Sequence, residues 1–122
     1  MPRIMIVDDE PNTVELTKAV LELNGFEPIG FTDPRFALDE LKKGLKPDLI
    51  ILDMRMPGIS GPEFCKEIRR DETLKDIRIV FFTASSDEKA DLLKEYNVLG
   101  FIFKPFDNDI LIDQINQFLK KG

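Results

Sequence analysis

The chain has 122 residues, a formal net charge of −6, one cysteine and no histidine. This length suits a single domain that folds without a disulfide or metal staple. The missing histidine excludes Ser-His-Asp and Cys-His nucleophile pairs and His-containing zinc sites, and the lone cysteine excludes an internal disulfide.

The first predicted elements are a strand, a helix and a weaker strand. The apolar run Ile4–Val7 predicts the first strand, and Pro11–Asn24 predicts a helix that ends before Gly25. Phe26–Phe31 predicts the weaker strand. Pro28 within it indicates the edge of a sheet, because proline has no N–H to donate to a ladder.

The middle of the chain repeats this alternation. Asp33 is a suitable cap for a helix over Pro34–Lys43, which opens with proline in its first turn. The run Leu49–Leu52 predicts a strand, and Pro62–Arg70 predicts the next helix. The strands lack polar alternation, which is typical of a parallel sheet covered on both faces.

The last part of the chain predicts two more strand–helix pairs. A strand is expected over Ile77–Phe82, and Ser85 and Glu88 have capping-box spacing at the start of a helix that runs to about Asn97. The final strand and helix cover Phe101–Phe103 and Asp107–Lys121. The apolar stripe of that helix contains Ile110, Leu111, Ile115, Phe118 and Leu119.

Five strands that alternate with five helices predict an α/β fold of (βα)5 type. Crossovers between parallel strands are almost always right-handed, which leaves few topologies. We expect a flavodoxin-like three-layer sandwich with strand order 2-1-3-4-5, which places the strand containing Pro28 at an edge. Residues 1–122 are expected to form one domain, with no output domain in this chain.

Polar residues follow the apolar runs at the ends that a parallel sheet brings to one edge. Asp8 and Asp9 follow the first strand, Asp53 the third, Thr83 the fourth and Lys104 the fifth. Three carboxylates there would repel one another unless a cation or the lysine offset their charge. Oxygen ligands of this kind suit Mg²⁺. The same arrangement makes Asp53 a plausible phosphoryl acceptor, with Lys104 and Thr83 near the transferring group.

Each of these residues also has a purely structural interpretation. Asp8 or Asp9 could cap the first helix, Asp53 could be a turn residue, and Thr83 could simply end a β-branched strand. No shared structural reason explains the whole set, which favours the functional interpretation.

The chain resembles the CheY-like receiver domains of response regulators in two-component signalling. The resemblance covers essentially the whole chain and is carried by four stretches of sequence. These stretches are Ile4–Glu10, Leu49–Gly58, Phe82–Ala84 and Gly100–Phe106.

The resemblance implies the roles of the acidic residues. Asp53 would be the phosphorylated aspartate, and Asp8 and Asp9 would complete an acidic pocket for Mg²⁺. Asp9 is the stronger candidate for direct contact with the metal, and Arg55 would contribute its backbone carbonyl oxygen.

The resemblance also implies a switch. Thr83 and Lys104 would bind the phosphoryl group, and the Lys104–Pro105 bond would be cis. Phe101 occupies the position of the family's switch aromatic, and it would rotate into space that Thr83 vacates. The face made by the fourth helix, fifth strand and fifth helix would then change shape. Ordinary strand packing is the alternative role of Phe101.

The implied function is a non-enzymatic signalling module that undergoes only its own phosphorylation and slow autodephosphorylation. Its partners would be a histidine kinase or phosphotransfer protein and a downstream protein target. We expect a monomer or a phosphorylation-dependent dimer in the cytoplasm, with no direct nucleic-acid binding and no membrane insertion.

Other functions stay open at this point. The chain could be a receiver excised from a longer response regulator or hybrid kinase. An aspartate-nucleophile phosphatase would need a second acid two residues after Asp53, where Arg55 stands. A flavodoxin-like cofactor binder would need a phosphate-cradling loop after the first strand, where Asp8, Asp9 and Glu10 would repel phosphate.

Overall fold

One parallel sheet of five strands forms the centre of the molecule. The computed structural model describes residues 1–85 and 90–121. The strands are β1 (Arg3–Val7), β2 (Glu27–Phe31), β3 (Leu49–Asp53), β4 (Ile79–Thr83) and β5 (Phe101–Phe103). Their order is β2-β1-β3-β4-β5, and every neighbouring pair is parallel. The predicted topology is therefore confirmed, and Pro28 lies on an edge strand.

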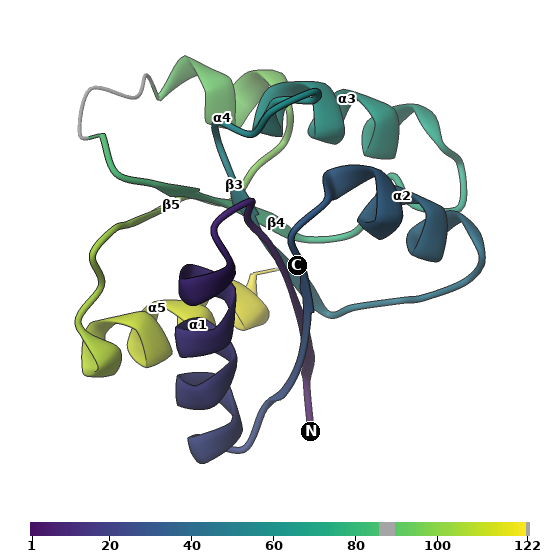
Figure 1. Cartoon of the computed structure of the whole chain (residues 1–122). Coiled ribbons are helices and arrows are strands. Elements are labelled where there is room, and N and C mark those ends of the chain that lie inside the picture. Colours follow the sequence, from purple (N-terminus) through teal and green to yellow (C-terminus); the bar gives the residue numbers. More distant parts are fainter. Residues whose placement is uncertain (86–89, 122) are drawn as a thin grey trace.

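The helices cover both faces of this sheet. They are α1 (Pro11–Leu23), α2 (Pro34–Lys42), α3 (Gly61–Arg70), α4 (Asp91–Glu95) and α5 (Asn108–Lys120). Figure 1 shows α2, α3 and α4 on one side of the strands and α1 and α5 on the other. Alternate strand residues enter two separate apolar clusters, Met5 and Ile50 on the first side and Ile4 and Ile51 on the second. The central strands β1, β3 and β4 are buried on both faces, as their continuous apolar runs predict.

The local sequence explains where the first three helices begin. The side chains of Glu10 and Asp33 cap α1 and α2, each directly before a proline in the first turn. Ser60 and Glu63 form a reciprocal capping box at the start of α3. The suggestion that Asp8 or Asp9 caps α1 is wrong, since Glu10 occupies that position.

Several boundaries differ from the sequence prediction by one or two residues. β4 begins at Ile79 because Ile77 belongs to the preceding turn, where its N–H donates to the carbonyl of Leu74 at 3.0 Å. The proposed capping box at Ser85 and Glu88 involves residues 86–88, which lie outside the described residues.

Two side chains illustrate the burial pattern. Ile110 was expected on the apolar stripe of α5, but 59% of it is exposed, because the buried face consists of Leu111, Ile115 and Phe118. Cys65 on α3 is fully buried in the first cluster, and this burial raises the pKa of its thiol to about 12.

Candidate functional site

The polar residues predicted to meet at the carboxyl edge of the sheet do meet there. Asp8 follows β1, Asp53 is the last residue of β3, Thr83 is the last residue of β4, and Lys104 follows β5. β1, β3, β4 and β5 are consecutive neighbours in the parallel sheet, so their carboxyl ends lie side by side. Each residue comes from a different strand end, and the sheet alone brings them together.

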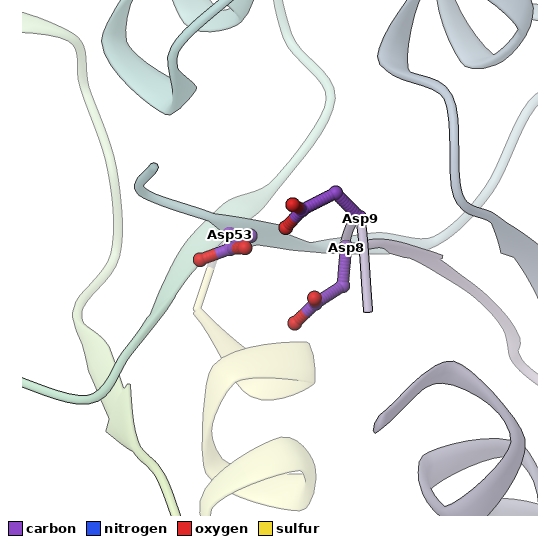
Figure 2. Close-up of side chains that lie close together, drawn as sticks. All are labelled: Asp8, Asp9 and Asp53. Carbon is purple, nitrogen blue, oxygen red and sulfur yellow. The ribbon is translucent and has the colours of Figure 1, made fainter. Parts of the chain in front are cut away.

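Three carboxylates form a compact acidic cluster. Asp8, Asp9 and Asp53 each offer one carboxylate oxygen within 4.8 Å of the others. Figure 2 shows the side chains at the ends of β1 and β3, with the Asp9 carboxylate extending toward Asp53. Asp8 is 0% exposed and Asp53 is 7% exposed, whereas Asp9 is open to solvent. One side of the cluster is thus dry and the other accessible.

Asp8 is fixed at both of its oxygens. Oδ1 accepts a hydrogen bond of 2.9 Å from the backbone N–H of Glu10. Oδ2 is fully buried and lies 2.6 Å from Lys104 Nζ, which also lies 3.4 Å from Asp53 Oδ1. The same Nζ lies 4.9 Å from the centroid of the Phe82 ring. The ammonium therefore sits between the two buried carboxylates.

The acidic cluster changes the acidity of Asp53. The pKa of the Asp53 carboxyl is raised from 3.8 to about 6, chiefly by burial and then by the neighbouring Asp8 charge. The Lys104 charge opposes this rise in pKa, and the Arg55 backbone N–H, 3.5 Å from Asp53 Oδ1, opposes it to a smaller extent. At neutral pH the Asp53 carboxyl is mostly ionised, but its surroundings destabilise the charged form. An additional cation near it would stabilise that charge.

The loop after β3 is held close to Asp53 by a glycine. The Gly61 N–H donates to the Met54 carbonyl at 2.9 Å. A Cβ at position 61 would lie 2.6 Å from the Asp53 carbonyl oxygen and 3.0 Å from Met54 Cα. Only glycine allows this approach of α3 to the strand end. Met54 and Met56 are buried and pack the loop.

Thr83 is linked to Lys104 through the backbone. Its side chain is buried, and its Oγ1 accepts a hydrogen bond of 3.1 Å from the Ser85 N–H. The Thr83 carbonyl accepts a hydrogen bond of 2.8 Å from the Lys104 N–H. The Lys104–Pro105 peptide bond is cis, as the resemblance implies. Hydroxyl and ammonium thus belong to adjacent, hydrogen-bonded strand ends.

Phe101 packs in a short row of aromatic rings. Its ring stacks on Phe81 at a centroid distance of 5.9 Å and lies 6.2 Å from the ring of Phe103. The register pairs Phe101 with Phe81, whereas Phe103 pairs with Thr83. The packing interpretation of Phe101 is confirmed, and its role as a switch stays a prediction.

The donor set suits a small, hard divalent cation. The cluster offers only oxygen atoms, one of its members is open to solvent, and one buried oxygen has Lys104 as its counter-charge. Mg²⁺ prefers a few carboxylates together with water molecules, which this half-open cluster can accommodate. The participation of the Arg55 carbonyl oxygen stays a prediction.

A mostly apolar groove lies directly beside the acidic cluster. It has a volume of about 240 Å³ and extends between α1 and the loop after β5. Its lining consists of Thr13, Leu16, Phe82, Ala84, Lys104, Pro105 and Phe106.

Within the described part of the chain, no helix has the length and apolar character needed to cross a bilayer.

Comparisons with known proteins agree with this architecture. A family model described as "Response regulator receiver domain" matches residues 4–116. The chain is 36% identical to the phosphate regulon transcriptional regulatory protein PhoB of Escherichia coli, over 98% of this chain and 52% of that protein. It is 32% identical to the DNA-binding response regulator MtrA of Mycolicibacterium smegmatis, over 98% of this chain and 51% of that protein. The chain therefore spans about half the length of these curated relatives.

Two solved structures match over nearly their full lengths. The response regulator TrrA of Thermotoga maritima, in complex with Mg²⁺ and BeF, is 38% identical with a TM-score of 0.83. The match covers 97% of this chain and 99% of that one. The chemotaxis protein CheY4 of Vibrio cholerae is 29% identical with a TM-score of 0.88, covering 97% of this chain and 98% of that one.

Proposed function

Because the chain belongs to the response regulator receiver family, we propose that it is a phosphorylation-controlled signalling module in which Asp53 accepts the phosphoryl group. The observation that carries this proposal is the position of Asp53. Its carboxylate ends β3 between two further carboxylates and the Lys104 ammonium. Such a cluster combines a nucleophilic oxygen with groups that can neutralise an incoming phosphate.

The phosphoryl donor would be a phosphohistidine on a histidine kinase or phosphotransfer protein. This chain has no histidine, so the donor must be another molecule. An ionised Asp53 carboxylate oxygen forms a bond to phosphorus while the phosphorus–nitrogen bond of the donor breaks. The electron pair of that bond leaves with the imidazole nitrogen, which then takes up a proton from solvent. A pKa of about 6 leaves most of Asp53 ionised at neutral pH.

Charge neutralisation would be shared among the surrounding groups. Mg²⁺ held by Asp8, Asp9, Asp53 and the Arg55 carbonyl would offset negative charge on the phosphoryl oxygens. Lys104 already contacts Asp53 and would turn its ammonium toward a phosphoryl oxygen. The Thr83 hydroxyl would donate to another phosphoryl oxygen.

The output would be a change in the face formed by α4, β5 and α5. Phosphorylation replaces the single negative charge of the Asp53 carboxylate with a phosphoryl group of about −1.5 to −2 charges, which would draw the Thr83 hydroxyl inward. Phe101 would rotate into the space that Thr83 vacates. Because Phe101 stacks between Phe81 and Phe103, its movement would change the environment of the partly exposed Phe103 ring.

The proposed partners follow from the same site. The apolar groove beside Lys104 is a suitable docking surface for the phosphodonor, because it opens next to the acceptor. A downstream protein would recognise the altered output face, as a complex with a monomer or with a phosphorylation-dependent dimer. We place these events in the cytoplasm, with only self-phosphorylation and slow autodephosphorylation as chemistry.

A second candidate is that this receiver works within a longer regulator. It is favoured by the names of the relatives: PhoB is a transcriptional regulatory protein and MtrA a DNA-binding response regulator, and the chain matches about half of each. In that arrangement, DNA binding would belong to a different domain. The phosphatase alternative is disfavoured because Arg55 stands where that chemistry needs a general acid.

Incubation with acetyl phosphate and Mg²⁺ tests the proposed acceptor. We expect the intact mass to increase by one phosphoryl group in the wild type and to stay unchanged in Asp53→Asn. Asp71→Asn is the matched control, because Asp71 lies at the carboxyl end of α3, opposite the end that packs on Asp53, and it should be phosphorylated normally. Phosphorylation of Asp53→Asn, or none of the wild type, would overturn the assignment.

A further inference from the structure

A single arginine ties three segments of the chain together. Arg69 lies in the last turn of α3, where its guanidinium is partly buried. Its nitrogens donate to four backbone carbonyls, each within hydrogen-bonding distance. The acceptors are Lys75 O at 2.7 Å, Ile77 O at 2.8 Å, Tyr96 O at 2.9 Å and Asn97 O at 2.9 Å. Two belong to the connection between α3 and β4, and two follow α4.

The two acceptors after α4 are the carbonyls of its C-cap residue, Tyr96, and of the next residue, Asn97. α4 ends at Glu95, with Tyr96 as its C-cap residue, and Asn97 adopts a positive φ of 55°. The last carbonyls of a helix have no N–H partner in the next helical turn. A positive charge near them is therefore favourable. The Arg69 guanidinium, with its planar set of donors, supplies this charge from a different helix. Arg69 therefore caps the carboxyl end of α4.

Among the described residues, the amino end of α4 has no comparable side-chain hydrogen bonds, and its Leu92 and Leu93 pack against the first apolar cluster. The helix has only five residues, and each of them keeps some exposure to solvent. Within the described residues, no side chain caps its amino end. Beyond the carboxyl end, by contrast, Val98 is buried, and Leu99 donates to the Ile79 carbonyl at 2.9 Å. Figure 1 shows α4 beside α3, with its amino end on the side that leads back to β4.

We propose that Arg69 makes the carboxyl end of α4 a fixed pivot, so that phosphorylation displaces α4 mainly at its amino end. This inference rests on the proposed function, because Thr83 at the end of β4 is the residue that would respond to the phosphoryl group. A change there reaches α4 through its amino end, while the guanidinium holds residues 96–97 to α3 and to the turn before β4. Arg69 is thus a positioning residue for the output face, far from the acceptor.

Hydrogen exchange of the whole chain, with and without Mg²⁺ and beryllofluoride, tests the pivot. Beryllofluoride stands in for the phosphoryl group on Asp53. In the wild type we expect activation to change exchange at residues 90–93 and to leave residues 96–99 nearly unchanged. In Arg69→Lys, which keeps the charge but has one nitrogen in place of the three that reach these carbonyls, we expect exchange at residues 96–99 to be about tenfold faster before activation. The activation-dependent change should then spread into that segment.

Arg70→Gln is the matched control, because Arg70 is the next residue of the same helix, is exposed, and forms an ion pair with Glu67. It should reproduce the wild-type pattern. Circular dichroism and the melting temperature show whether each variant is folded. If a variant does not fold, hydrogen exchange of the wild type with and without beryllofluoride still shows which end of α4 moves.

The outcomes separate the two proposals. Equal activation-dependent change at both ends of α4 in the wild type overturns the pivot and leaves the proposed function intact. An unchanged pattern in Arg69→Lys overturns the role of Arg69. If beryllofluoride changes exchange nowhere in the wild type, the proposed function fails and the pivot fails with it.

Discussion

The Lys104 ammonium lies 2.6 Å from the buried Asp8 Oδ2, a shorter contact than its 3.4 Å separation from Asp53 Oδ1. In this state Lys104 is therefore primarily the counter-charge of Asp8. The Lys104 N–H donates a hydrogen bond to the Thr83 carbonyl. A shift of the Lys104 backbone toward Asp53 would therefore also move the end of β4. The ion pair thereby links the charge of the acidic cluster to the residue whose backbone is hydrogen-bonded to the end of β4.

Replacing Lys104 with methionine should destabilise the protein when no divalent cation is present. The buried Asp8 carboxylate would lose its counter-charge, which we expect to cost about 3 kcal/mol in the free energy of unfolding. Adding Mg²⁺ should stabilise Lys104→Met more than the wild type, because the cation replaces the missing positive charge. Urea unfolding with EDTA and with Mg²⁺ measures both effects.

Lys75→Met is the control for this experiment, since Lys75 forms an exposed ion pair with Glu72. It should change the free energy of unfolding little and respond to Mg²⁺ as the wild type does. Equal effects of Mg²⁺ on Lys104→Met and on the wild type would contradict the charge-replacement argument.

Asp53→Asn should stabilise the metal-free protein, and the gain should depend on pH. The folded carboxyl keeps its proton up to about pH 6, whereas the unfolded one releases it near 3.8. The wild type therefore loses stability as the pH rises through this range, and the asparagine variant does not. The advantage of Asp53→Asn should grow to about 3 kcal/mol above pH 6 and then stay constant.

The measurement is urea unfolding in EDTA across this pH range. Asp71→Asn provides a contrast of opposite sign, because a hydrogen bond from Thr73 holds the pKa of the exposed Asp71 below its usual value. Asp71→Asn should become relatively less stable as the pH rises. A gain from Asp53→Asn that does not vary with pH would count against the raised pKa.

Asp9→Asn should weaken Mg²⁺ binding without damaging the fold. Asp9 is the exposed member of the acidic cluster, so its loss removes a proposed metal ligand and also some repulsion among the carboxylates. A tenfold loss of affinity would reduce the stabilisation by saturating Mg²⁺ by about 1.4 kcal/mol. The rise in melting temperature on addition of Mg²⁺ reports this. Glu10→Gln, at the neighbouring helix cap, should keep most of that rise.

Gly61→Ala should affect both stability and phosphorylation. The new methyl group would meet the Asp53 carbonyl oxygen at 2.6 Å, so β3 and α3 must move apart, at a cost of about 1–3 kcal/mol. Acetyl phosphate should label the variant more slowly because Asp53 is displaced. Ser60→Ala removes the adjacent helix cap and should lower stability by about 1 kcal/mol without slowing the labelling. Similar labelling rates for the two variants would argue against the close approach as the cause.

The strand order and the meeting of Asp8, Asp53, Thr83 and Lys104 could be predicted from the sequence. Apolar runs locate the strands, and the parallel arrangement places every residue that follows a strand at one edge. The division of charge within that edge could not be predicted. Lys104 Nζ lies 2.6 Å from Asp8 and 3.4 Å from Asp53, and a sequence pattern cannot reveal so small a difference between two distances.

Other features depend on close packing that a sequence pattern does not reveal. Ser60, Gly61 and Glu63 carry a visible capping signal, yet the tight contact of Gly61 with the Asp53 backbone appears only in three dimensions. Arg69 looks like any cation at the end of a helix, but its four acceptors come from segments up to 28 residues away. The exposure of Ile110 likewise reflects which face of α5 meets the sheet.

The burial of Cys65 makes this protein a convenient host for site-specific probes. The thiolate is the reactive form of cysteine, and a fully enclosed thiol with a pKa of about 12 forms almost none at neutral pH. Because Cys65 is the chain's one cysteine, a second cysteine introduced on an exposed position such as Lys94 would be labelled selectively in the folded state. A spin label or fluorophore attached there would follow α4 directly during signalling, with the native residue left in place.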